Sequence, residues 1–167
     1  KWPDHNFTVS AEVGWQHYKL KEWPGTFIFD NGQSNNFSLK LGFGRYTLDN
    51  PIFPRDGSDF SISVQATPPY SLLNNKDHKN MDNASQYKWI EYHKWSFKGS
   101  IFTRLGASNF VLMARAQMGY LGYYNKDIGY SPFEGFLVGG DGMSGYTLYG
   151  QENIGVRGYS NGSLTPY

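Results

Sequence analysis

Residues 7–16 read Phe-Thr-Val-Ser-Ala-Glu-Val-Gly-Trp-Gln, and apolar and polar side chains alternate along the whole stretch. Successive side chains of a β-strand point to opposite faces of a sheet, whereas a helix repeats its apolar positions every three or four residues. A period of two is therefore typical of a strand that has one apolar face and one polar face. The stretch therefore predicts such a strand.

Outward along the chain, four more segments repeat this alternation, so that the predicted strands cover residues 6–20, 36–48, 58–70, 88–104 and 108–121. The apolar face carries, for example, Val9, Leu41, Val64, Phe97 and Leu112, and the polar face carries Ser10, Lys40, Gln65, Lys98 and Gln117. Such runs exceed the ~5–6 residues of soluble strands and match the ~9–11 residues that cross a bilayer. The pattern predicts an all-β fold, part of an antiparallel transmembrane β-barrel, although alternation alone fits a soluble antiparallel sheet equally well.

The connections between the predicted strands alternate between long and short. Long polar connections lie at 21–35 and 73–87, and short turns lie at 49–57 and 106–108. A membrane barrel keeps its long loops outside and its short turns on the periplasmic side, and aromatic residues form girdles at both interfaces. Aromatic residues gather near the ends of the predicted strands, at Trp15, Tyr18, Tyr46, Trp89, Tyr92, Tyr120, Tyr123 and Tyr124. Both features favour the membrane barrel over the soluble sheet.

The composition excludes several other classes of protein. The 167 residues carry a net charge of +1, which argues against a strongly basic nucleic-acid surface. Cysteine is absent, which excludes disulfides, thiolate zinc sites and cysteine nucleophiles. No stretch approaches the ~18 apolar residues of a membrane helix, and residues 1–5 lack the apolar core of a signal peptide. We therefore expect the chain to begin inside a mature protein.

The polar residues form no recognisable catalytic or metal-binding arrangement. The histidines lack metal-ligand spacing; they are His5, His17, His78 and His93. The charged residues at polar-face positions are scattered, as expected along a wet barrel interior; they are Glu12, Lys40, Lys98 and Arg115. No Ser-His-Asp arrangement or phosphate-binding loop stands out. The sequence predicts no catalytic residue, no metal, no cofactor and no enzymatic activity.

The segment 122–167 contains eleven glycines and is too long for an idle loop in a compact domain. Residues 131–141 read Ser-Pro-Phe-Glu-Gly-Phe-Leu-Val-Gly-Gly-Asp, and residues 156–159 read Val-Arg-Gly-Tyr. Upstream, residues 53–57 read Phe-Pro-Arg-Asp-Gly. These motifs resemble those of the BamA family. That family carries a Pro-Phe-Glu-x-Phe-x-x-Gly-Gly segment and a Val/Ile-Arg-Gly-Phe/Tyr motif in its sixth extracellular loop, and a Phe-Pro-Thr-Asp-Gly periplasmic turn, where this chain has Arg for Thr.

The resemblance implies the later middle part of a barrel in the bacterial cell outer membrane, without the early strands, the last strands and the periplasmic POTRA domains. It implies a core barrel subunit of the outer-membrane protein assembly machinery, which folds and inserts β-barrel proteins. The implied partners are nascent outer-membrane proteins, accessory lipoproteins of the machinery and the lipid bilayer, with no nucleic acid. A related translocation or secretion pore stays open as an alternative. So does a soluble carbohydrate-binding β-sandwich, whose exposed Trp and Tyr side chains would stack on sugars.

The resemblance also implies which loop residues matter; they are Val156, Arg157, Gly158, Tyr159, Phe133, Glu134, Gly139 and Gly140. In the family, the arginine reaches inward to acidic residues on strands that follow the loop. We therefore expect the segment 122–167 to fold back into the barrel mouth, with Arg157 bound to a carboxylate. The guanidinium offers a planar fork of donors that binds a carboxylate bidentately, and the glycine after it permits a tight backbone path.

Overall fold

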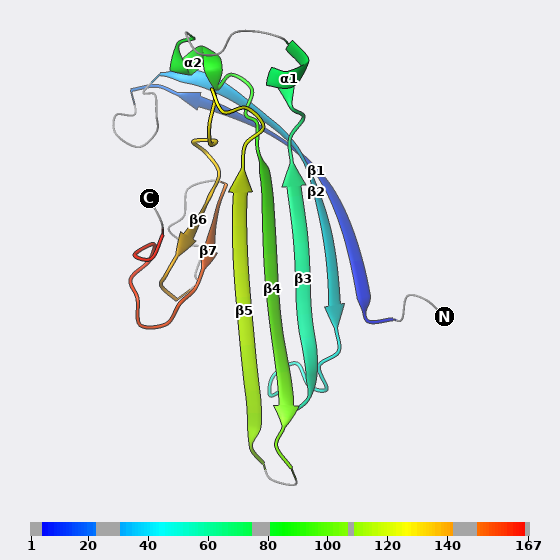
Figure 1. The fold of residues 1–167 in the computed structure, drawn as a ribbon. Coiled ribbons are helices and arrows are strands. Elements are labelled where there is room, and N and C mark those ends of the chain that lie inside the picture. The colour runs from blue at the N-terminus through cyan, green and yellow to red at the C-terminus, as the bar shows by residue number, and fades with distance from the viewer. Residues whose placement is uncertain (1–4, 23–30, 75–80, 107–108, 142–149, 166–167) are drawn as a thin grey trace.

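The computed structural model describes residues 5–22, 31–74, 81–106, 109–141 and 150–165. Five strands form one antiparallel sheet in chain order (Figure 1); they are β1 (Phe7–Leu20), β2 (Gly32–Tyr46), β3 (Gly57–Ala66), β4 (His93–Arg104) and β5 (Val111–Gly122). Two short strands, β6 (Gly135–Val138) and β7 (Gln151–Ile154), pair in parallel as a separate small sheet. The expected all-β, antiparallel fold class is confirmed.

Two short helices, α1 (Tyr70–Asn74) and α2 (Asn83–Gln86), lie in the connection between β3 and β4. Within the described ranges, no helix has both the length and the apolar character needed to cross a membrane. Both helices lie at the upper end of the sheet in Figure 1, and the turns that join β2 to β3 and β4 to β5 lie at the other end. The long and short connections therefore occupy opposite ends of the strands.

The strand register gathers the apolar positions on one face of the five-stranded sheet. Leu41 of β2 pairs with Val64 of β3, and Val64 pairs in turn with Trp95 of β4. Nothing in the described residues covers this face, since Val9 remains 76% exposed and Leu41 51% exposed. An uncovered apolar surface of this extent marks a contact with a membrane or with another protein layer.

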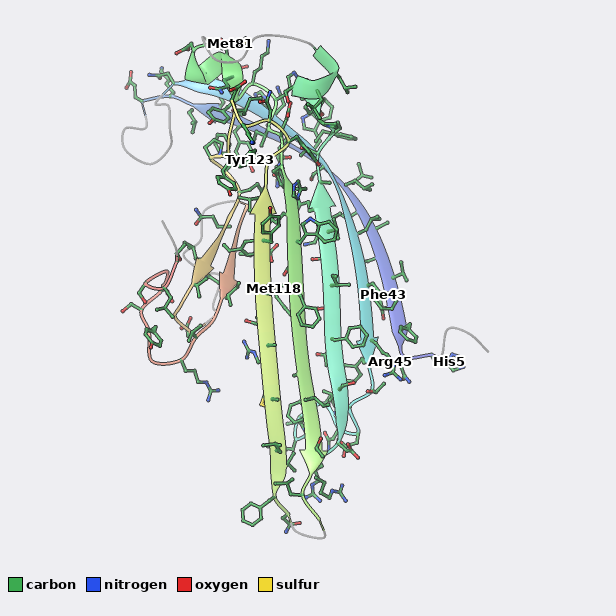
Figure 2. The ribbon with its side chains drawn as sticks, in the orientation of Figure 1. His5, Phe43, Arg45, Met81, Met118 and Tyr123 are labelled. Carbon is green, nitrogen blue, oxygen red and sulfur yellow. The ribbon has the colours of Figure 1, made fainter. Side chains whose placement is uncertain are left out.

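Charged and polar side chains bound this apolar face at both ends of β1 and β2. At one end, Arg45 lies near Phe43, and its guanidinium carbon lies 5.4 Å from the centre of the Phe7 ring (Figure 2). At the other end, the apolar positions stop at Trp15, and the next residue on the same face is His17. The apolar surface is therefore a band of limited height.

The strand bounds differ from the sequence pattern at several strand ends. Strand β3 ends at Ala66 rather than at residue 70, where α1 begins, and β5 begins at Val111 rather than at residue 108. Strand β2 begins at Gly32 rather than at residue 36, because Gly32 pairs with Leu20 and extends the hairpin with β1. Strand β4 begins at His93 rather than at residue 88. The residues before His93 do not pair with β3 or β5, and they contact β2 through a parallel bridge between Asn35 and Trp89. The predicted loop 122–167 also contains the two strands β6 and β7.

The hydrophobic core lies at the end of the sheet where β1 and β5 finish. Its buried members are Tyr87, Ile90, Tyr92, Ile128 and Phe133, and the half-buried side chains packed against them are Tyr18, Leu20 and Leu121. Tyr92 is fully buried, so the prediction that it belongs to an exposed aromatic girdle is wrong. The core joins the β3–β4 connection to the first part of the C-terminal segment, and so it fixes where that segment starts.

The turn between β2 and β3 is held by the Asp49 carboxylate. Its Oδ1 accepts hydrogen bonds from the backbone N–H groups of Arg55, at 2.8 Å, and of Asp56, at 3.2 Å. These bonds hold the pKa of the Asp49 carboxyl below its ordinary value. Gly57 closes the turn with a φ of 105°, a left-handed conformation that favours glycine. The residues of the Phe-Pro-Arg-Asp-Gly motif thus form a compact turn.

Candidate functional site

The C-terminal segment folds back onto the polar face of the five-stranded sheet, beside β5 (Figure 1). The ring of Phe136 on β6 lies against Gly119 of β5, so closely that a Cβ atom at that glycine would clash with it. Phe133 stacks on Tyr18 of β1, with ring centroids 4.5 Å apart and an interplanar angle of 10°. The segment is thus seated on the sheet by aromatic contacts to its first and last strands.

Lys94 of β4 is the central polar contact between the sheet and the segment. Its Nζ lies 3.2 Å from Glu134 Oε2 and 3.5 Å from Glu152 Oε1, and it donates a 2.7 Å hydrogen bond to the carbonyl oxygen of Gly150. The same ammonium lies 4.9 Å from the centre of the Phe136 ring. One cation therefore contacts the residue before β6, the residue before β7 and one residue of β7. We call this group of residues, namely Lys94, Glu134, Glu152 and Gly150, the lysine clamp.

The lysine clamp is buried. The side chains of Lys94 and Glu134 are 3% and 2% exposed, whereas that of Glu152 is 30% exposed. Burial raises the pKa of the Glu134 carboxyl; the Lys94 ammonium and a hydrogen bond with Tyr92 oppose this shift without cancelling it. Charged groups at such depth are costly unless they are paired and hydrogen-bonded, and here both conditions hold.

A network of neutral polar side chains on the sheet surrounds Glu134. Asn36 Nδ2 lies 3.3 Å from Glu134 Oε1 and 3.3 Å from the Tyr92 hydroxyl, and Gln65 Nε2 donates to that hydroxyl at 2.7 Å. Burial raises the pKa of Tyr92 well above its ordinary value, and the charge of Glu134 adds to this rise. The hydroxyl therefore stays protonated, and the network connects β2, β3 and the residue before β4 to the loop without adding charge.

Backbone geometry brings the two sequence motifs of the segment together. Gly139 N–H donates to the Ile154 carbonyl at 3.0 Å, and Gly140 N–H donates to the Tyr159 carbonyl at 2.9 Å. An antiparallel bridge pairs Gly140 with Val156. Gly139 and Gly140 have φ values of 123° and 80°, and a Cβ atom on either would clash with residues 160–161, so both positions require glycine.

The structure places the predicted loop residues in three groups. Phe133 and Glu134 are buried against the sheet, while Gly139, Gly140 and Val156 form the link between the two motifs. Three residues lie at the surface; they are Arg157, Gly158 and Tyr159. The geometry of the described residues does not test the expected pairing of Arg157 with a carboxylate, so that pairing stays a prediction.

Sequence reasoning missed Lys94, Asn36 and Tyr92 as site residues. A signal existed for Lys94, because it occupies the same polar face of β4 as Ser96 and Lys98. Its partners could not be read from the sequence, because Glu134 lies 40 residues further along the chain, in a segment without a strand pattern.

The other polar-face charges do not converge on one centre. Glu12 and Lys40, which pair in register, line a cleft of about 280 Å³ between the sheet and the lysine clamp. Lys98 and Arg115 line a separate hollow of about 300 Å³ further along the strands. Among the described residues, no group of three or more His, Asp or Glu side chains could hold a metal ion. The arrangement suits a wet surface and the attachment of a loop.

An antiparallel sheet with one uncovered apolar face, one polar face and a loop folded onto the polar face defines a class: the wall of a transmembrane β-barrel with a loop in its interior. The chain belongs to the Omp85 superfamily, because the model of the Omp85 superfamily domain matches residues 3–167.

A solved structure supports the same fold. The crystal structure of BamA from Haemophilus ducreyi lacking POTRA domains 1–3 is similar, with a TM-score of 0.57 and 20% sequence identity. The similarity covers 84% of this chain and 26% of that one, so the chain spans about a quarter of the protein it matches. The expected resemblance to BamA is confirmed at the level of the fold.

Proposed function

We propose that this chain is part of a core barrel subunit that folds and inserts β-barrel proteins into a bacterial outer membrane. The observation that carries the proposal is the docking of the loop: both loop motifs are joined to each other, and the lysine clamp fixes them to the polar face of a sheet whose apolar face is uncovered. Superfamily membership and the BamA-like fold support a barrel that works in assembly or translocation.

The proposed activity makes and breaks no covalent bond and uses no cofactor. A strand that enters lipid alone exposes unpaired N–H and C=O groups. Each unpaired group costs on the order of several kcal/mol. A barrel that offers an open strand edge supplies partners for these groups and lowers the barrier to insertion. The loop docked on the polar face holds the strands of the barrel wall in position while the edge opens.

We further propose that the loop motif residues act as one unit. Arg157 would bind a carboxylate on the inner wall of the complete barrel, as its exposed position at the surface of the loop allows. The lysine clamp would hold the other end of the same segment. Nascent outer-membrane proteins, accessory lipoproteins and the bilayer are the proposed partners.

Of the alternatives, a translocation or secretion pore fits the same superfamily and the same docked loop. The soluble carbohydrate-binding β-sandwich is not retained. In the described residues the second sheet, β6–β7, lies on the polar face, whereas a sandwich would bury the apolar face between its two sheets.

Reconstitution of the full-length parent protein in lipid vesicles tests the proposal. We expect a denatured β-barrel substrate to fold into these vesicles faster than into protein-free vesicles, as measured by protection from protease. A vesicle-enclosed reporter measures passage of a soluble passenger protein in parallel. If the substrate folds no faster and the soluble passenger protein crosses the membrane, the insertase proposal is wrong and the translocation pore takes its place.

A further inference from the structure

The apolar face ends, beside the helices, in a hollow walled by four aromatic side chains. Trp15 comes from β1, Phe37 from β2, Tyr70 from α1 and Trp89 from the connection before β4, and together they line about 260 Å³. Trp15 is 71% exposed and Trp89 is 41% exposed, so the hollow opens outward. It lies on the opposite face of the sheet from the lysine clamp, and the proposed function does not use it.

Hydrogen bonds outside the four rings position two of the segments that line the hollow. The backbone of Asn35 holds the segment that carries Trp89, because Asn35 N–H donates to the Lys88 carbonyl and the Ile90 N–H donates to the Asn35 carbonyl, both at 2.9 Å. Helix α1 is fixed by the buried Glu91 carboxylate, which accepts hydrogen bonds from the backbone N–H and the hydroxyl of Ser71. The Tyr70 and Trp89 rings then meet with centroids 5.0 Å apart.

Polar and basic side chains follow directly above the hollow on the same face. His17 and Lys19 lie two and four residues beyond Trp15, which places them about 7 and 14 Å further along the strand. Both side chains are exposed, and His17 Nδ1 lies 2.8 Å from Asn35 Oδ1, which shows that these two side chains share the outward face. The Glu91 carboxylate near Tyr70 is buried and bound by Ser71, so it does not neutralise this rim.

We propose that this surface binds one anionic lipid. A lipid chain occupies the aromatic hollow and continues down the apolar face over Val13 and Leu39, and the phosphate of the headgroup binds Lys19 and His17. The observations that select this partner are the apolar surface below, the Lys19 ammonium and the His17 imidazole above, and aromatic side chains at the boundary, where amphipathic rings are favoured. A long lysine side chain can bring its ammonium to a headgroup while its stem contacts apolar surface.

The proposal requires the sheet to span a membrane, but it does not require insertase activity. Quenching of tryptophan fluorescence by lipids with brominated chains tests it in the full-length parent protein. Vesicles of phosphatidylcholine receive either brominated phosphatidylglycerol or brominated phosphatidylcholine. The part of the signal lost in Trp15→Phe reports on the hollow. We expect the anionic lipid to occupy the hollow with a preference on the order of fivefold, which is the effect of one basic side chain near an anionic headgroup.

The variant Lys19→Gln combined with His17→Gln should bring the quenching by the two brominated lipids close to equality. Lys98→Gln is the matched control, because Lys98 lies on the polar face and its substitution should leave the preference intact. Equal quenching in the unmodified protein, or a preference that survives the double substitution, would overturn the proposal. Folding of a barrel substrate in the same vesicles is read by protease protection, so a failure of the insertase proposal stays distinguishable.

Discussion

At the scale of single residues, Lys94 is the side chain on which the position of the loop depends most. Replacing Lys94 with Met leaves Glu134 buried without its cation, a change that costs about 3–5 kcal/mol for a buried pair. We expect Lys94→Met to release the β6–β7 sheet from the polar face. Hydrogen exchange of the full-length protein should then show faster exchange in residues 135–138 and 151–154, with β3 and β4 unchanged in their protected centres.

Two comparisons separate the clamp from a general effect of losing charge. Lys98→Met removes a lysine from the same strand and face, and it should change the exchange rates little because Lys98 is exposed. Lys94→Met with Glu134→Leu should recover part of the protection, because an apolar pair often replaces a buried ion pair without loss. If Lys98→Met and Lys94→Met have equal effects, the clamp does not hold the loop.

Arg157 carries the second prediction at this scale. As an exposed side chain it would contribute only about 0–1 kcal/mol through a salt bridge, whereas a pair buried in a complete barrel would cost about 3–5 kcal/mol to break. We expect Arg157→Ala to lower the heat stability of the full-length barrel and the cellular content of other barrel proteins. Arg157→Lys should rescue this only in part, because an ammonium lacks the planar fork. Unchanged stability and content in Arg157→Ala would mean that the loop has no lock at this position.

The sequence located the loop residues but not their partners. Phe133, Glu134, Gly139 and Gly140 could be singled out because a motif contains them, and the structure brings Gly140 to Val156 of the other motif. The contact between Lys94 and Glu134 depends on the path of the chain between them, which short-range patterns do not determine.

At the scale of elements, the turn between β2 and β3 carries a pH-dependent prediction. The folded-state pKa of Asp49 is lowered by the N–H groups of Arg55 and Asp56, so its stabilising contribution is present above the unfolded pKa. That contribution is lost as the pH falls through the lowered folded value. We expect NMR titration of the full-length protein to give an Asp49 carboxyl midpoint below its ordinary pKa of 3.8. The amide signals of residues 55 and 56 should shift with the same midpoint, and a midpoint at or above that value would show that the carboxylate does not hold the turn.

The long strands could be predicted and the short ones could not, for a physical reason. Strands β1 to β5 each expose one face to an apolar and the other to a polar environment over at least 10 residues, so the alternation is visible in the sequence. Strands β6 and β7 have four residues each, all half-buried, and pair in parallel. The start of β4 was predicted too early because residues 88–92 are apolar enough to resemble a strand, while Ile90 and Tyr92 serve the core instead.

At the scale of the whole molecule, the two faces of the five-stranded sheet make different contacts. The polar face receives the C-terminal segment through the lysine clamp, and the apolar face remains uncovered from Phe43 to Trp15. Both ends of the apolar band carry polar or charged side chains, with Arg45 at one end and His17 at the other. This distribution is that of a barrel wall whose outer surface meets lipid and whose inner surface meets water.

The central claim, that the five-stranded sheet crosses a membrane with its apolar face toward lipid, is tested most directly by cysteine labelling. The chain contains no cysteine, so each introduced thiol reports on one position. In the full-length protein in membranes, a lipid-restricted thiol reagent should label Val9→Cys, Leu41→Cys and Leu112→Cys. It should leave their polar-face counterparts Ser10→Cys, Lys40→Cys and Gln117→Cys unlabelled, because successive side chains point to opposite faces. Equal labelling of the two sets would contradict the claim.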